Sequence, residues 1–422
     1  MAQSNNKNII KNKVHTDEEN MELLYANSIR DIFYLAKCAI NNVSPDLSRV
    51  KVMNGDFIFN ISTFHSVEAL VFYALRLCDL GITVKDKATG TDIDIMSEAF
   101  GFSRELLSRW SNAYKGATLK NVQLDTGRTE LFEALDKMGC WYLPLKGAIL
   151  KNMYPAAGMR QMSDNDILFD ESFRQQVKAW FEEHGYTTQH YNTGYDDVYV
   201  KLPFRCYEMH VSLIGSDMKL WWSYYKDIKD RLVRIEGTDY GYAFTDEDFY
   251  VYMILHAYKH YQSAGTGIRL FFDMYIYINE KSKNMDWDYI KKQCELLKIE
   301  PFEELVRTLT VKLMLDDKSP TESLSSSERK SLMYIIESGT YGTVSNRIKN
   351  GVGQSSDGRP PLSGKVKYLF SRIFLPKELM YIQNPLCRKH HWLLPAFYII
   401  RIFKGLTQKR IYDEVGKTVK MK

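Results

Sequence analysis

A block of short strand-like segments between Cys140 and Leu213 interrupts a chain whose other apolar residues recur at helical spacing. CWYLPL and NDILF are predicted as buried strands, and YTTQHY, DVYVKL and RCYEMHVSL as an antiparallel run of three. An amphipathic helix is predicted between these two groups, over 171–186. This order predicts an α+β protein, with a small mixed β-sheet core flanked by N- and C-terminal helical regions.

The same patterns predict how the chain is divided. The first twenty residues are polar and expected to be loose, and helices are expected over 93–114 and 121–138. The predicted parts are an N-terminal helical region (1–138), the sheet core (139–215), a C-terminal helical domain (216–350), a Gly/Ser/Pro-rich linker (351–364) and a basic amphipathic C-terminal segment (365–422).

Composition places the chain among soluble globular proteins. Hydrophobic residues make up 45% and charged residues 26% of its 422 residues, which excludes a disordered chain, a collagen and a coiled-coil rod. The six cysteines form no C-x-x-C pair and are typical of a reducing compartment. No apolar stretch approaches the twenty residues that a transmembrane helix needs. The sequence therefore predicts a cytoplasmic protein.

Charge is distributed unevenly along the chain. Residues 359–422 contain fourteen Lys and Arg against three Asp and Glu, whereas the remainder is mildly acidic. A basic end on an acidic body indicates an anionic partner. That partner is either a membrane surface or nucleic acid, and the alternative is a helix packed on the body with solvated lysines.

Asp164 and Asp166 flank Asn165 at the start of a predicted strand. Because side chains alternate along a strand, both carboxylates are expected on one face. Their mutual repulsion is relieved if a hard cation such as Mg²⁺ binds between them. The alternative is an ordinary strand-edge turn with solvated aspartates.

Two further features add to this pair. Lys146 and Gly147 follow the first predicted strand and precede a short helical stretch, where backbone N–H groups can approach a phosphate. Glu208 and His210 alternate on a later strand and share a face. A third carboxylate would complete a two-metal site, which activates an attacking oxygen and stabilises a leaving one.

The string LKGAILKNMYPAAGMRQMSDNDILF, followed by YEMHVSL, LHAYKH and GIRLFFDM, resembles the bacterial family called uncharacterised nucleotidyltransferase. That family belongs to the superfamily related to DNA polymerase β. The resemblance implies that Asp164 and Asp166 hold the metals, that Glu208 is the third acidic residue, and that Gly147 lies against the triphosphate. It also implies a nucleotidyltransferase core at the sheet.

One departure from the family pattern concerns the phosphate. The superfamily's turn is usually Gly-Ser, but here Gly147 is followed by Ala148 and preceded by Lys146. Lys146 and Arg160 are the candidates to replace the missing hydroxyl contact, since Arg binds phosphate with a bidentate fork. Alternatively, Arg160 forms an ion pair with an acid in a loop.

The predicted function is transfer of a nucleoside monophosphate from an NTP, with Mg²⁺, to an unknown acceptor that is a small molecule, a peptide or RNA. Alternatives are a toxin-like transferase that modifies tRNA or protein, and a silent binding module of the same fold.

Several other polar residues have open roles. His210 either orients a carboxylate or is structural. His256 and His260, four apart, are either packing residues or a zinc pair, although H-A-Y-K-H lacks the glutamate of a zinc protease. Arg269 and Asp273 either pair along one helix or contact the base or the acceptor.

Overall fold

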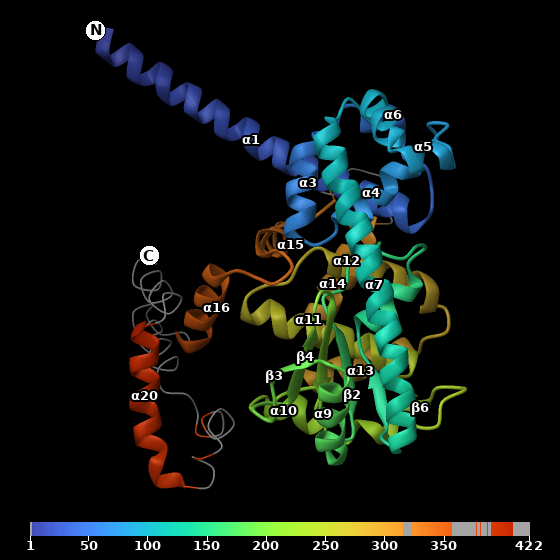
Figure 1. Cartoon of the computed structure of the whole chain (residues 1–422). Coiled ribbons are helices and arrows are strands. Elements are labelled where there is room, and N and C mark those ends of the chain that lie inside the picture. The colour runs from blue at the N-terminus through green and yellow to red at the C-terminus, as the bar shows by residue number, and fades with distance from the viewer. Residues whose placement is uncertain are drawn as a thin grey trace.

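The computed structural model describes residues 2–314, 323–356 and 390–407, and the single positions 377, 380 and 386. A five-stranded sheet lies between helices that precede and follow it along the chain (Figure 1). The predicted α+β class, with a mixed sheet flanked by helices, is confirmed. The strands are β1 (Tyr142–Pro144), β2 (Asn165–Phe169), β3 (Thr187–His190), β4 (Asp196–Lys201) and β5 (Arg205–His210), with a separate pair, β6 (Val233–Arg234) and β7 (Tyr242–Ala243).

The strand order is β1-β2-β5-β4-β3. β3, β4 and β5 form the predicted antiparallel run, and β1 pairs antiparallel with β2. Only β2 and β5 are parallel neighbours. The chain between them includes α9 (Arg174–Glu183), the predicted amphipathic helix, followed by β3 and β4.

Seven helices precede the sheet: α1 (Ala2–Ile40), α2 (Leu47–Val50), α3 (Gly55–Phe64), α4 (Glu68–Arg76), α5 (Val84–Thr89), α6 (Thr91–Phe100) and α7 (Arg104–Met138). The expectation of a loose N-terminus is wrong, because α1 begins at Ala2 and its first half projects away from the other helices (Figure 1). The expected break before residue 121 is also wrong, since α7 is one helix of 35 residues. A glycine such as Gly116 costs a helix only about 1 kcal/mol, and packing on either side of it outweighs that.

The helices after the sheet are α10 (Lys219–Tyr225), α11 (Asp246–Ser263), α12 (Arg269–Lys281), α13 (Trp287–Leu297), α14 (Glu300–Met314), α15 (Ser326–Ser338), α16 (Val344–Ser356) and α20 (Leu394–Thr407). Residues 351–356, expected as the start of a linker, are the last turns of α16. The rest of that expected linker, and most of the basic segment, lies outside the described residues. Among the helices of the described segments, none has the length and apolar character needed to span a bilayer.

Helices cover both faces of the sheet. α7, which runs from the N-terminal helices down alongside the sheet (Figure 1), packs with α9 on one face through a cluster that includes Leu131, Phe181 and Ile167. On the other face, Leu168 of β2 belongs to a cluster built mainly from α11, with smaller contributions from α12, α13 and α14. Alternation along β2 therefore directs Asp166, which shares the face of Leu168, toward α11 and α12.

Candidate functional site

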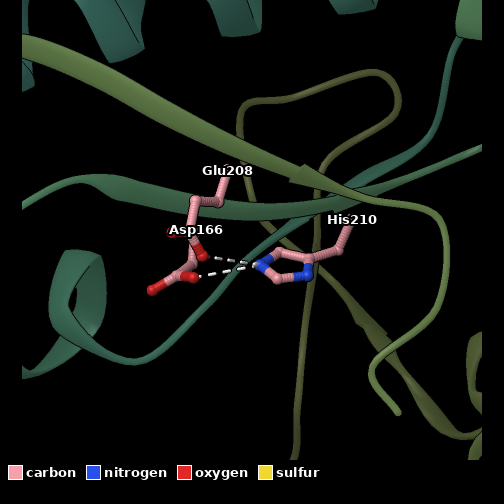
Figure 2. Close-up of side chains that lie close together, drawn as sticks. All are labelled: Asp166, Glu208 and His210. Carbon is pink, nitrogen blue, oxygen red and sulfur yellow. Dashed lines mark hydrogen bonds and ion pairs between the residues drawn. The ribbon is translucent and has the colours of Figure 1, made fainter. Parts of the chain in front are cut away.

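The parallel strands β2 and β5 place two acidic side chains opposite each other. Asp166 is the register partner of Glu208, and Leu168 is the partner of His210. Alternate residues of a strand share a face, so Asp166, Glu208 and His210 project to the same side of the sheet (Figure 2). Parallel pairing thus brings Asp166 of the Asp-x-Asp pattern together with both residues of the Glu-x-His pattern. Asp164 lies one residue before β2 begins and is not part of this group.

Asn165, the residue between the two aspartates, faces the other way and is fully buried. Its amide donates to the carbonyl of Leu124 at 2.9 Å and its side-chain oxygen accepts from Nη1 of Arg128 at 3.0 Å. Both partners lie on α7. A polar residue in this strand is therefore fully satisfied, and it fixes the position of β2, and so of the aspartates, against α7.

His210 joins the two strands of the cluster. Its Nε2 lies 3.0 Å from Oδ1 of Asp166 and 3.9 Å from Oε2 of Glu208, and both contacts converge on this nitrogen (Figure 2). The three side chains each offer one ligand atom, and these atoms lie within 4.8 Å of one another. Within the described residues, this group could hold a metal ion. The alternative in which His210 orients a carboxylate agrees with its contact to Asp166.

Lys146 is tied to the same carboxylate. Its Nζ lies 3.1 Å from Oδ1 of Asp166, and both side chains are largely buried. Burial alone would lower the pKa of Lys146, but the charge of Asp166 raises it above its ordinary value. The backbone of Lys146 has φ +40°, a conformation that costs a non-glycine residue of order 1–3 kcal/mol. The turn between β1 and the next helix is therefore strained, and it aims this ammonium at the cluster.

Gly147 begins α8 (Gly147–Leu150), a single helical turn. A Cβ at this position would lie 2.6 Å from both Nη1 of Arg160 and Sδ of Met162, so any larger residue would have to displace the ends of these two side chains. Within the described part of the chain, the N–H groups of Lys146 and Gly147 donate to no protein acceptor. One helical turn contributes little dipole, so these two N–H groups are the features of the turn that can bind an anion.

Arg160 forms a bidentate ion pair with Asp273 of α12. Its Nε and Nη2 donate to the two carboxylate oxygens at 2.8 and 2.9 Å, and both side chains are largely buried. Tyr154 also donates to this carboxylate, at 2.8 Å. The alternative in which Arg160 pairs with an acid is therefore present in the structure. The acid is remote in sequence, and only the Nη1 group of Arg160 faces Gly147.

Arg269 is a cation without a carboxylate partner in the described residues. Its Nη1 donates to the carbonyl of Gln161 at 3.1 Å, and the expected pairing with Asp273 along α12 is absent because Asp273 binds Arg160. Burial and the charge of Arg160 lower the pKa of Arg269. Asp273, the carboxylate that attracts Arg269, is already bound by Arg160, so this partly buried guanidinium is poorly compensated and an anionic ligand would stabilise it.

The three carboxylates have different electrostatic surroundings. Burial opposes the ionisation of Asp166, but Lys146 and His210 hold its pKa well below the ordinary value. Burial and the charge of Asp166 raise the pKa of Asp164 to about 6, and the same two causes, with Asp164, raise that of Glu208 to about 7. Asp164 and Glu208 therefore carry negative charge that the protein compensates poorly.

His256 and His260 of α11 face each other across the helix surface, with 3.1 Å between their Nε2 atoms. Burial lowers the pKa of both rings, to about 4 for His260, so they form a neutral pair. Within the described residues no third His, Cys, Asp or Glu joins them in a metal-binding group. Both rings line the cavity described next, and His260 is exposed.

Most of these groups, though not Asn165, Tyr154 or His210, line one cavity of about 360 Å³ between the sheet, α11 and α12. Its lining includes every residue that the sequence predicted for the site: Lys146, Gly147, Arg160, Asp164, Asp166 and Glu208. The opposite wall contains His256, His260, Arg269 and Asp273. The structure thus brings the predicted residues together, although Lys146 and Arg160 are already engaged by carboxylates.

Tyr341 is a lining residue that the sequence did not single out. It lies in the loop between α15 and α16, and its hydroxyl is 2.7 Å from Oγ of Ser163. A tyrosine between the glycines of GTYGT was the available signal, but nothing in the sequence places this loop beside the aspartates.

Comparison with protein families finds one match: the family model described as uncharacterised nucleotidyltransferase covers residues 56–314, more than half of the chain. No curated protein and no solved structure matches. The matched segment contains β1 to β5, α11 and α12, but it ends before the loop that carries Tyr341.

Proposed function

Because the chain belongs to the uncharacterised nucleotidyltransferase family, we propose that it moves a nucleoside monophosphate from a nucleoside triphosphate to an acceptor and releases pyrophosphate. The observation that carries this proposal is the distribution of charge in the cavity. Asp164 and Glu208 are poorly compensated anions, and Arg269 is a cation without a carboxylate partner in the described residues. In a triphosphate complexed with divalent cations, the cations complement the two carboxylates and the phosphate oxygens complement Arg269.

The carboxylates are suited to hold the metal. Asp164, Asp166 and Glu208 supply the oxygen ligands that Mg²⁺ prefers, and we propose a two-metal site at these residues. A negatively charged triphosphate could not approach the three carboxylates without such cations between them. When bound, Mg²⁺ would neutralise phosphate charge and activate the acceptor oxygen. His210 holds Asp166 in place through the bond to Nε2, as residues behind a metal site commonly do.

The remaining polar groups are proposed to position the triphosphate. Lys146, Gly147 and Arg160 are the proposed binding residues: the first two through their backbone N–H groups, and Arg160 through Nη1. Because the Lys146 ammonium is paired with Asp166, its main effect is to orient that carboxylate. Arg269 is proposed as the side chain that binds phosphate oxygens directly, since it has the uncompensated charge.

Glu208 is proposed to take the proton from the acceptor. Its side chain is 37% exposed, compared with 11% for Asp166, so an acceptor hydroxyl can reach it from solvent. The acceptor oxygen then forms a bond to the α-phosphorus, and pyrophosphate leaves with the electrons of the broken P–O bond. Catalysis of this kind depends mainly on positioning and charge neutralisation.

The basic C-terminal segment is proposed to contact an anionic partner, either a membrane surface or nucleic acid. In the described part of this segment, Trp392, just before α20, is 77% exposed, and Ile399, on α20, is 55% exposed. Exposed apolar side chains next to many lysines and arginines are typical of segments that lie on anionic surfaces. The acceptor itself is proposed to be a small molecule, a peptide or RNA.

The experiment that tests the function is transfer of a radiolabel. The purified chain would be incubated with Mg²⁺, cell extract and each NTP in turn, labelled at the α-phosphate. The expected result is label attached to a new molecule with a preference among the four NTPs. Extract without the protein is the control. If none of the four labels is transferred, and none is bound by the protein, the proposed function is wrong.

A further inference from the structure

Tyr341 stands at the rim of the proposed nucleotide cavity. It lines the cavity together with Asp164 and Arg269, yet 72% of the residue is exposed, against 9% for Asp166. The carboxylates therefore form the floor, and the ring of Tyr341 forms part of the mouth. A large aromatic ring left so exposed beside a polar cavity has one face available to a ligand.

The loop that carries this ring is held on both sides. The N–H of Thr340 donates to the carbonyl of Phe64 at 3.2 Å, and the N–H of Thr343 donates to that of Ala264 at 3.0 Å. Gly339 and Gly342 both have positive φ, and a Cβ on either would collide with these same neighbours. The backbone around Tyr341 is thus fixed before any ligand binds.

The orientation of the ring is also fixed. Its hydroxyl is hydrogen-bonded to Oγ of Ser163, the residue directly before Asp164. The ring is therefore anchored at its polar end beside the aspartates, while much of the rest remains open to solvent. A side chain held in this way loses little conformational entropy when a flat ligand stacks on it.

We propose that Tyr341 forms a nucleobase subsite, on which the base of the bound NTP stacks. This inference rests on the proposed function: metal ions at the carboxylates and Arg269 place the phosphates at the floor of the cavity. The nucleoside then extends toward the mouth, where Tyr341 stands. Stacking accepts any base, but the larger purine ring covers more of the phenol, so the subsite favours ATP and GTP over CTP and UTP modestly.

The subsite lies outside the segment that matches the family, which ends at residue 314. The phosphate and metal residues lie within that segment, and Tyr341 does not. The proposed base-binding residue therefore lies in a loop after the matched region, whereas the proposed phosphate-binding residues lie within that region.

The test compares ligands with and without a base. Calorimetry would measure binding of ATP, of CTP and of inorganic triphosphate to the full chain, with Ca²⁺ in place of Mg²⁺ to suppress turnover. Tyr341→Ala should weaken ATP binding by about ten- to a hundred-fold, CTP binding by less, and inorganic triphosphate binding not at all. Tyr341→Phe keeps the ring and should stay within a few-fold of wild type, and Tyr341→Trp should bind at least as well.

Two controls separate stacking from other effects. Ser163→Ala removes the hydrogen bond but keeps the ring, and should lose far less affinity than Tyr341→Ala. Tyr240→Ala removes another exposed tyrosine, one that does not line the cavity, and should change nothing.

Several outcomes would overturn the inference. Equal loss of ATP and inorganic triphosphate in Tyr341→Ala would assign Tyr341 to the phosphates, and Tyr341→Phe as weak as Tyr341→Ala would assign the effect to the hydroxyl. A nucleoside monophosphate attached to the Tyr341 hydroxyl after incubation with NTP and Mg²⁺, with release of pyrophosphate, would make Tyr341 an acceptor instead. If wild type binds neither NTPs nor triphosphate, the proposed function fails and this subsite with it. If wild type binds ATP and Tyr341→Ala binds it equally well, only the subsite is wrong.

Discussion

Asp166 and Glu208 lie opposite each other on the parallel strands β2 and β5, yet their carboxylates are compensated very differently. Asp166 has Nζ of Lys146 at 3.1 Å and Nε2 of His210 at 3.0 Å, whereas Glu208 has only that same Nε2 at 3.9 Å among its ion-pair contacts in the described residues. Repulsion between the carboxylates, expected from the sequence for Asp164 and Asp166, is therefore only part of the electrostatics of this site, because Lys146 and His210 compensate Asp166 alone. Neutralising one carboxylate of the site should have the opposite effect from neutralising another.

The first prediction concerns Asp164 and Asp166. Asp164→Asn should raise the melting temperature of the metal-free protein at neutral pH, because it removes a poorly compensated buried charge. Asp166→Asn should lower it, because buried Lys146 would lose its counter-charge. Thermal unfolding in the presence of a chelator measures both. Equal shifts in the two variants would contradict the ion pair with Lys146.

The second prediction concerns pH. The pKa of Glu208 is about 7 in the folded chain and 4.5 as its ordinary value, so the folded state binds more protons between these values. The contribution of Glu208 to the stability of the metal-free protein should therefore fall as pH rises from about 5 to 8, while the lowered pKa values of His256 and His260 make an opposite contribution below about pH 6.5. Glu208→Gln should flatten this fall, and saturating Ca²⁺ should do so too. A Glu208→Gln curve parallel to that of wild type would show that Glu208 ionises normally.

The third prediction concerns Arg160 and Asp273. Asp273→Asn leaves a buried guanidinium without its partner and should cost about 3–5 kcal/mol in the free energy of unfolding, measured with urea. The double variant Arg160→Met with Asp273→Leu should recover most of this loss, since it removes both charges. A double variant as unstable as the single one would mean that the pair is needed for packing rather than for charge balance.

The fourth prediction concerns Arg269, the cation without a carboxylate partner in the described residues. Arg269→Ala should weaken binding of inorganic triphosphate and of all four NTPs by a similar factor, about ten- to a hundred-fold. Arg269→Lys should recover part of the affinity but lose the bidentate geometry. Calorimetry with Ca²⁺ measures these constants. A loss confined to one NTP would instead assign Arg269 to base recognition.

The fifth prediction concerns the basic segment. Removal of residues 359–422 should weaken binding to anionic vesicles or to RNA, and the binding that wild type shows should itself weaken with salt. Co-sedimentation with anionic vesicles, neutral vesicles and RNA distinguishes the two partners. Unchanged binding with a lower melting temperature would mean that the segment packs on the body.

Part of this site could be predicted because its residues follow local rules. Alternation along a strand puts Asp166 on one face of β2, and Glu208 and His210 on the equivalent face of β5, whereas Asp164 lies one residue before β2 begins. That these two faces coincide depends only on β2 pairing with β5 in this register. Sequence patterns of this kind survive folding because the strand period is fixed by the backbone.

Other parts could not be predicted, because they depend on tertiary contacts between distant segments. Arg160 and Asp273 are 113 residues apart, and nothing local to either shows that they meet. The pairing leaves Arg269 without the partner that helical spacing suggested. Tyr341 reaches Ser163 across 178 residues, through a loop whose backbone hydrogen bonds go to Phe64 and Ala264 in two distant segments.

The central claim is that the carboxylates of this cavity bind the metal for nucleotidyl transfer. Release of pyrophosphate, measured with wild type and Asp164→Asn under identical Mg²⁺, NTP and extract, tests it most directly. Asp164→Asn is the suitable variant because it should fold at least as stably as wild type. The account predicts that wild type releases pyrophosphate as label reaches the acceptor, and that Asp164→Asn is at least about a hundred-fold slower. Equal rates in a well-folded Asp164→Asn would contradict it.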